Sequence, residues 1–191
     1  MIITFHNISK RPRNRWELTP EQFKIIINSV PLNTEIHFDD ARKGVYEFAY
    51  PILKDRIKKG QKVTIFMVPN WLDGLAPPRE QYSPFMEWRQ LKELAKAGIE
   101  MGSHSLTHPN LANLPSADVT RELAESKDLI EVWTGSTVNK FAYPYGVYTE
   151  EVMKIVKQYY SYAYGLFPPK LQTNWNIPRK TVVNHNLDKR S

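Results

Sequence analysis

Two histidines in the segment "GSHSLTHPNL", His104 and His108, are the first candidates for chemistry. A neutral imidazole is a good zinc ligand, but a catalytic zinc site also needs a third protein ligand and an open position for water or substrate. Residues four apart share one face of a helix, so the spacing is equally compatible with ordinary surface side chains. The histidines therefore need a carboxylate partner before they indicate a metal site.

Asp39 and Asp40 in "HFDDARKG" are the carboxylates best placed to join them. An isolated pair of this kind would more often cap a helix or be solvated, but both this segment and the histidine segment follow predicted strands. Ligand sites of parallel α/β folds collect at the carboxyl ends of the strands, so the two segments would open on the same rim. Asp40, His104 and His108 would then form a metal site of two histidines and one carboxylate, which suits hydrolysis.

Short β-rich runs and amphipathic helical patterns alternate along the whole chain. This alternation indicates an α/β fold in which crossover helices join parallel strands. With 191 residues, we predict a single domain spanning 1–191, and about seven parallel strands suggest closure into a barrel. The predicted strands are 2–5, 35–38, 62–68, 99–103, 140–143, 160–165 and 180–183.

Helix boundaries carry signals of their own. The segment "TPEQF" has the pattern of a capping box with Thr19 as the N-cap. Ser83 and Pro84 predict the start of a further helix that ends at Gly98. Pro51 predicts the start of a helix, or a kink in one.

The composition is typical of a globular protein, with 41% hydrophobic and 24% charged residues. No apolar run approaches the roughly 20 residues needed to span a bilayer, so we predict no transmembrane segment. The start of the chain does not have the pattern of a signal peptide, which favours a cytoplasmic location over an exported form whose leader has been removed. Because the chain has no cysteine, any metal must be held by His, Asp or Glu.

A net charge of +6 and the basic segment "KRPRNRW" at 10–16 raise the question of nucleic-acid binding. A solvated loop after the first strand explains this segment better, and the remaining charge is spread through mixed Lys/Glu helices. We therefore predict no nucleic-acid partner. A basic rim could equally attract an anionic glycan.

The longest irregular stretch, residues 69–84, directly follows a predicted strand. Loops of this length in compact domains are often functional. Trp71 and Tyr82 offer flat surfaces that could stack on sugar rings, although anchoring of the loop itself is the somewhat stronger interpretation.

Three motifs in this order resemble the polysaccharide deacetylases of carbohydrate esterase family 4, which remove N-acetyl groups from amino sugars on a distorted (β/α) barrel. "HFDDA" is similar to the family's first motif, which implies Asp39 as the base and Asp40 as a metal ligand. "HSLTH" matches its His-Ser/Thr-x-x-His motif. "FAYPYG" is similar to the third motif, which implies a groove shaped by Tyr143 and Pro144 and a backbone N–H of Tyr145 that serves the oxyanion.

Other features resemble the poly-β-1,6-N-acetylglucosamine deacetylase branch of the family. "ITFHNI" is similar to that branch's N-terminal motif and implies His6 as the general acid, with His185 as the second choice. Ala41 and Ala142 depart from the family, since Gly and Arg are usual at these positions. In place of the missing arginine, we expect Arg179, in "NIPRKTV", to orient the site carboxylates.

Together these observations predict a metal-dependent hydrolase that removes N-acetyl groups from a GlcNAc-containing polysaccharide or sugar-lipid. The predicted cofactor is a divalent metal, with zinc first and cobalt, nickel or iron as alternatives. A non-catalytic glycan-binding protein on the same scaffold, or a hydrolase of another C–N bond such as a cyclic amide or ureide, is compatible with the same residues. The sequence does not determine the glycan linkage or the oligomeric state.

Overall fold

The computed structural model of the chain describes residues 1–167 and 172–185, and its main sheet has eight strands that all run parallel. The strand order is β10-β1-β4-β5-β6-β7-β8-β9. The strands are β1 (Ile2–Phe5), β4 (Glu35–Phe38), β5 (Val63–Met67), β6 (Glu100–Ser103), β7 (Lys140–Ala142), β8 (Tyr162–Gly165), β9 (Ile177–Pro178) and β10 (Lys180–Thr181). The seven predicted strands are thus confirmed.

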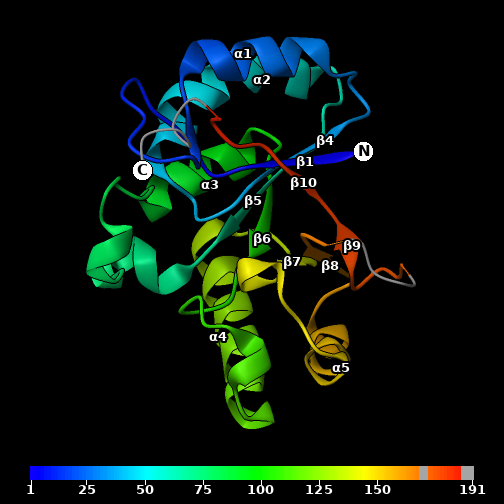
Figure 1. Cartoon of the computed structure of the whole chain (residues 1–191). Coiled ribbons are helices and arrows are strands. Elements are labelled where there is room, and N and C mark those ends of the chain that lie inside the picture. Colours follow the sequence, from blue (N-terminus) through cyan, green and yellow to red (C-terminus); the bar gives the residue numbers. More distant parts are fainter. Residues whose placement is uncertain (168–171, 186–191) are drawn as a thin grey trace.

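The sequence missed the eighth strand, β9, because two residues that include a proline show no alternation. β9 pairs with β8, whereas β10 pairs with β1 at the opposite edge of the sheet. A single residue, Arg179, separates these two strands, so it joins both edges of the sheet covalently. The result is a distorted (β/α) barrel whose strands lie between the helices (Figure 1).

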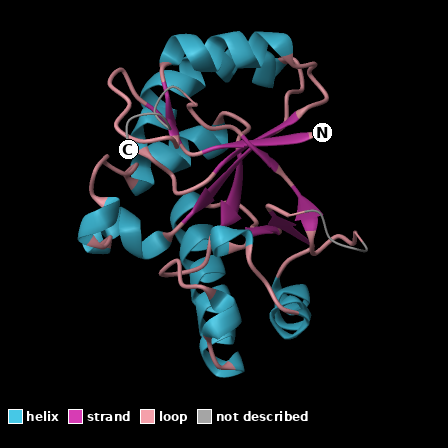
Figure 2. Cartoon of the chain, in the orientation of Figure 1, coloured by secondary structure: helices cyan, strands magenta, loops and turns pink. Residues whose placement is uncertain are grey.

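In the part of the chain that the structure describes, five α-helices surround the strands, with α1 and α2 on one side and α4 and α5 on the other (Figure 2). They are α1 (Pro20–Ser29), α2 (Tyr50–Lys58), α3 (Trp88–Lys96), α4 (Ser116–Thr134) and α5 (Glu150–Tyr159). The capping box of α1 is confirmed: the Gln22 N–H donates to Thr19 Oγ1 at 3.2 Å, and the Thr19 N–H donates to Gln22 Oε1 at 2.8 Å. Pro51 lies in the first turn of α2, as predicted.

The predicted start of α3 at Ser83 and Pro84 was wrong, because the helix begins at Trp88. The preceding residues are extended and bond instead to the segment after β4. The Lys43 N–H donates to the carbonyl of Pro84, and the Met86 N–H donates to the carbonyl of Ala41, both at 2.9 Å. Pairing with a distant segment therefore outcompetes the local helix signal, and it ties the long loop to the Asp-Asp segment.

A short second sheet pairs β2 (Asn7–Ile8) with β3 (Glu17–Leu18). The basic segment 10–16 forms the connection between these two strands. It therefore lies beside the carboxyl end of β1 rather than along a helix.

The interior of the barrel contains polar groups as well as aromatic rings. His37 on β4 is fully buried, and its ring lies 5.0 Å from that of Phe66 and 4.7 Å from that of Tyr164. Lys140 Nζ lies 2.5 Å from both Glu35, which is partly buried, and Glu100, which is exposed. No helix within the described ranges is long and apolar enough to cross a bilayer.

Candidate metal centre and its cavity

A cavity of about 540 Å³ opens at the carboxyl ends of the strands. All the site residues predicted from the sequence line this cavity except Pro144 and the second-choice acid His185. The lining residues are His6, Asn14, Trp16, Asp39, Asp40, Trp71, Arg79, Glu80, Tyr82, His104, His108, Tyr143, Tyr145, Gly146, Leu166 and Arg179.

Asp40, His104 and His108 form a group suited to a metal ion, with one ligand atom from each lying within 4.8 Å of the others. The two histidine Nε2 atoms are 3.2 Å apart. Two ligands at about 2.0–2.1 Å from one zinc ion in tetrahedral geometry are separated by about 3.3 Å, so this spacing fits the ion. A carboxylate and two imidazoles also match the donor preference of zinc and its neighbours.

The ring of His104 is oriented by the third motif. Its Nδ1 lies 2.6 Å from the carbonyl oxygen of Ala142, to which the Nδ1–H donates. This bond leaves Nε2 as the lone-pair atom facing Asp40 and His108, an arrangement that is common for metal-binding histidines. Ala142 therefore contributes through its backbone, although it lacks the arginine side chain usual at this position.

His108 is held in the neutral form that can bind a metal. Burial lowers the pKa of His108 to about 3, with a further contribution from the neighbouring His104. A metal ligand must be deprotonated, so a low pKa removes the competition from protons at neutral pH.

Left-handed backbone conformations concentrate at this site. Within the described part of the chain, the non-glycine residues with positive φ are Asp40 (70°), Ala41 (53°), Ser105 (66°), His108 (62°) and Tyr145 (60°). Each such residue costs on the order of 1 kcal/mol or more, and such strain typically clusters at functional sites. Ala41 adopts the conformation that favours glycine, so the turn is kept despite the departure from the family motif.

The turn that carries the two histidines is fixed to α4. Ser105 Oγ accepts the N–H of His108 at 3.0 Å. The carboxylate of Glu122 on α4 accepts the N–H of Thr107 at 2.9 Å and its hydroxyl at 2.6 Å. The sequence analysis missed Glu122, because one more glutamate on a charged helix carries no distinguishing signal.

Asp39 lies next to the metal group and is paired with Arg179. The two Nη atoms of Arg179 donate to the two carboxylate oxygens at 2.7 and 2.9 Å, and both residues are buried. Burial alone would raise the pKa of Asp39, but Arg179, with His104 and His6, outweighs it and holds this pKa well below its usual range. Asp39 is therefore ionised at neutral pH.

The two candidate acids lie in different places. His6 follows β1 and lines the cavity, with its ring 4.8 Å from that of Trp16. Burial lowers the pKa of His6, and the carboxylates of Asp40 and Asp39 oppose this shift. His185 is exposed and is not among the cavity-lining residues.

Comparison with known proteins places this geometry in a family. A family model described as polysaccharide deacetylase matches residues 33–164, which include Asp39, Asp40, His104 and His108. The chain belongs to the polysaccharide deacetylase family. Among curated relatives, it is 30% identical over 145 residues to YxkH of Bacillus subtilis, itself named only provisionally as a polysaccharide deacetylase, covering 74% of the chain and 48% of YxkH.

Further relatives extend this picture. A chitin deacetylase of Arthroderma benhamiae is 26% identical over 140 residues, covering 71% of the chain and 34% of that enzyme. The chain thus spans half or less of the length of these curated relatives. The structure of IcaB from Ammonifex degensii shares the fold, with a TM-score of 0.78 and 18% identity over 99% of this chain and 94% of that one. A wild-type pseudoenzyme of the family from Bacillus anthracis is 28% identical with a TM-score of 0.51, covering 65% and 39% of the two chains.

The aromatic residues of this deacetylase-family site differ in how far they are exposed to solvent. Trp71 is only 3% exposed and packs against the rings of Phe85 and His108, which matches the loop-anchoring interpretation, although its edge reaches the cavity. Tyr145 is 47% exposed and its ring lies 4.7 Å from that of His108. Tyr82 is partly buried beside the guanidinium of Arg42.

The groove-shaping roles that the resemblance implies for Tyr143 and Pro144 stay predictions. The side chain of Tyr143 is fully buried, and its hydroxyl donates to the carbonyl of Trp175 at 2.8 Å. Pro144 is buried and lies outside the cavity lining. Tyr143 nevertheless contributes to the cavity lining.

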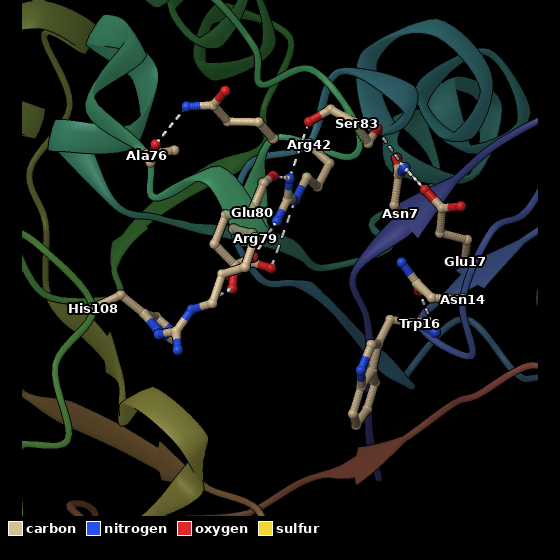
Figure 3. A network of polar contacts seen from close by, with 12 residues as sticks. Asn7, Asn14, Trp16, Glu17, Arg42, Ala76, Arg79, Glu80, Ser83 and His108 are labelled. Carbon is tan, nitrogen blue, oxygen red and sulfur yellow. Dashed lines mark hydrogen bonds and ion pairs between the residues drawn. The ribbon is translucent and has the colours of Figure 1, made fainter. Parts of the chain in front are cut away.

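Sequence reasoning missed two segments that line the cavity, and Figure 3 shows the polar network to which they belong. Asn14 and Trp16 come from the loop between β2 and β3, and Arg79 and Glu80 come from the 3₁₀ turn Pro78–Glu80. The aromatic and basic character of the segment 10–16 was a usable signal. It was interpreted as a solvated loop after the first strand, because nothing local places it beside the strand ends.

Proposed function

We propose that this chain is a metal-dependent hydrolase that removes N-acetyl groups from a GlcNAc-containing polysaccharide or sugar-lipid. The observation that carries the proposal is the convergence of Asp40, His104 and His108 beside the ionised Asp39 on one cavity wall. Membership of the polysaccharide deacetylase family supports the same reaction class.

Asp40, His104 and His108 would hold a divalent ion, with zinc as the first choice. When bound, such an ion lowers the pKa of water from about 16 towards about 7 and polarises the acetyl carbonyl. The hydrogen bond from His104 Nδ1 to the backbone orients this ligand before any ion arrives.

The remaining residues supply proton transfers and charge stabilisation. Asp39, kept ionised by Arg179, accepts the proton of the attacking water as general base. The backbone N–H of Tyr145 donates to the acetyl oxygen as negative charge develops there, an interaction worth roughly 3 kcal/mol. His6 protonates the leaving amine from its imidazolium form, which the neighbouring carboxylates of Asp40 and Asp39 favour against the burial that lowers the His6 pKa.

The shape of the site supports a sugar substrate over a small cyclic amide or ureide. The cavity of about 540 Å³ can take a sugar ring and part of a neighbouring ring, and aromatic surfaces of Trp16, Tyr82 and Tyr145 line it. The similarity to a chitin deacetylase favours an N-acetylglucosamine polymer.

The second candidate is a non-catalytic glycan-binding protein on the same scaffold. The similarity to a pseudoenzyme of the family supports this alternative. Against it stands the complete set of one base, three metal ligands and one acid in the same cavity.

The decisive experiment measures acetate release from N-acetylated chito-oligosaccharides and β-1,6-linked oligosaccharides by zinc-loaded protein. We expect release that is abolished by a chelator and restored by zinc. Glycan binding without acetate release from either series would favour the non-catalytic alternative.

A further inference from the structure

The charge of the cavity is unevenly compensated, and the imbalance lies on the wall formed by the Pro78–Glu80 turn (Figure 3). Arg79 and Glu80 both line the cavity. They face the basic loop between β2 and β3, which contributes Asn14 and Trp16 to the same cavity. The ionic partners of each charged group determine which charge remains for a ligand.

The acidic groups at this site already have matching cations. Asp39 is paired with Arg179. Glu80 is paired with Arg42, whose Nη2 donates to Glu80 Oε2 at 2.7 Å. Arg42 is fully buried and also donates through Nη1 to the backbone carbonyls of Glu80 and Ser83, so this pair is a fixed part of the wall. Asp40 belongs to the metal group.

The positive charge of Arg79 is compensated far less by neighbouring anionic groups. Its side chain is 71% exposed, and its contact with Glu80 Oε1 is a long 3.7 Å to a carboxylate that Arg42 already holds. Its side chain also donates a hydrogen bond from Nη2 to the hydroxyl of Tyr145 at 3.4 Å. The Tyr145 ring in turn lies 4.7 Å from that of the metal-ligand candidate His108. A cation is thus placed at the cavity mouth beside the centre.

The opposite side of the mouth is also basic. Arg13 Nη1 donates to the carbonyl of Tyr82 at 3.3 Å, which joins the basic loop to the wall that carries Arg79. The guanidinium of Arg15 lies 5.2 Å from the ring centroid of Trp16, a cavity-lining side chain. Positive groups therefore flank the mouth from two loops, in a chain whose net charge is +6.

We propose that the substrate carries an anionic group, a phosphate or a carboxylate, next to the N-acetylated sugar, and that Arg79 binds it. An arginine can hold either anion through two parallel N–H bonds. The same charges would repel the ammonium group of a neighbouring sugar that has already been deacetylated, so a cationic polymer is disfavoured. This inference rests on the proposed function and specifies its substrate class.

The test measures the reaction of zinc-loaded protein with three N-acetylated oligosaccharides of equal length. One is neutral, one carries a terminal phosphate monoester, and one carries a uronic acid next to the N-acetylglucosamine. We expect KM for the preferred anionic substrate to be about 10-fold below that of the neutral one at 50 mM NaCl, and the difference to shrink to about 2-fold at 500 mM. Comparison of the phosphate and carboxylate substrates identifies the source of the anion.

Arg79→Gln should reduce the preference for the anionic substrate to near 1, and Arg79→Glu should reverse it. The matched control is Arg89→Gln, because Arg89 on α3 is equally exposed at 70% but pairs with Glu93 on the same helix. It should leave the preference unchanged. Calorimetric titration of the same oligosaccharides provides a readout that does not depend on turnover.

Acetate release from all three oligosaccharides with equal KM, or a preference that survives Arg79→Gln, would overturn the inference and leave the proposed function standing. Absence of acetate from every substrate would overturn the proposed function instead. In that case, the calorimetric preference for the anionic oligosaccharide and its loss in Arg79→Gln would still decide the inference.

Discussion

Arg179 and Asp39 meet through two parallel hydrogen bonds of 2.7 and 2.9 Å although 140 positions separate them in the sequence. Arg179 can reach Asp39 because it forms the one-residue link between β9 and β10 that closes the barrel. The same residue thus connects the edges of the sheet and compensates the candidate base. We propose that it takes the place of the arginine that is usual in the family where this chain has Ala142.

Arg179→Gln should lower both activity and stability. Removing one partner of a buried ion pair leaves an uncompensated carboxylate and costs about 3–5 kcal/mol. We expect Asp39 to take up a proton at higher pH in the variant, so the acid limb of the kcat/KM profile should move upwards. Denaturant unfolding and a pH profile measure the two effects. Lys180→Gln, at the exposed adjacent residue on β10, serves as control, and equal profiles in all three proteins would contradict the role of Arg179.

Asp39→Asn and His104→Ala should separate catalysis from metal binding. The first variant keeps all three ligands, so we expect about one zinc per chain and acetate release reduced by at least about 100-fold. The second loses a ligand and should lose both zinc and activity. Elemental analysis of protein purified without a His-tag gives the metal content. Wild-type zinc levels in His104→Ala would remove the ligand assignment.

The two candidate acids can be distinguished by matched substitutions to glutamine. His6→Gln should lower kcat by about 100-fold or more, because the leaving amine then departs without a proton. His185 is exposed and lies outside the cavity lining, so His185→Gln should change kcat by less than about 2-fold. Acetate-release kinetics at saturating substrate provide the measurement, and a large loss in His185→Gln alone would reverse the assignment.

The buried His37 should make folding stability depend on pH. Burial, partly offset by Glu35, lowers the pKa of His37 to about 4 from an ordinary 6.5. Its contribution is therefore fully present above pH 6.5 and is lost as the pH falls towards 4, by about 3 kcal/mol at most. The shift of the Glu35 pKa, from 4.5 to about 2, affects stability only below about pH 4.5, at the lower end of this window.

Urea unfolding between pH 7 and 4.5 tests this expectation. His6 and His108 also have lowered pKa values, so the difference between wild type and His37→Phe isolates the term due to His37. We expect the phenylalanine variant to lose less stability on acidification. Parallel pH curves for the two proteins would show that His37 does not carry the effect.

Local patterns in the sequence determined much of the fold and of the candidate centre. Strand periodicity located seven of the eight strands of the main sheet, and the Thr19 capping box located the start of α1, because both signals act over a few neighbouring residues. The metal group was predictable for a related reason. Its three residues lie in two segments that directly follow recognisable strands, and the ends of parallel strands meet at one rim.

Only the tertiary structure decided which distant side chains meet. The pairing of residues 84–86 with 41–43 overrode the helix start expected at Ser83. Barrel closure brought Arg179 onto Asp39, and the pairing of β2 with β3 brought Trp16 beside His6. These contacts join segments up to 140 positions apart. No period or cap within one segment encodes such a contact, because its energy depends on a partner that only the folded chain brings near.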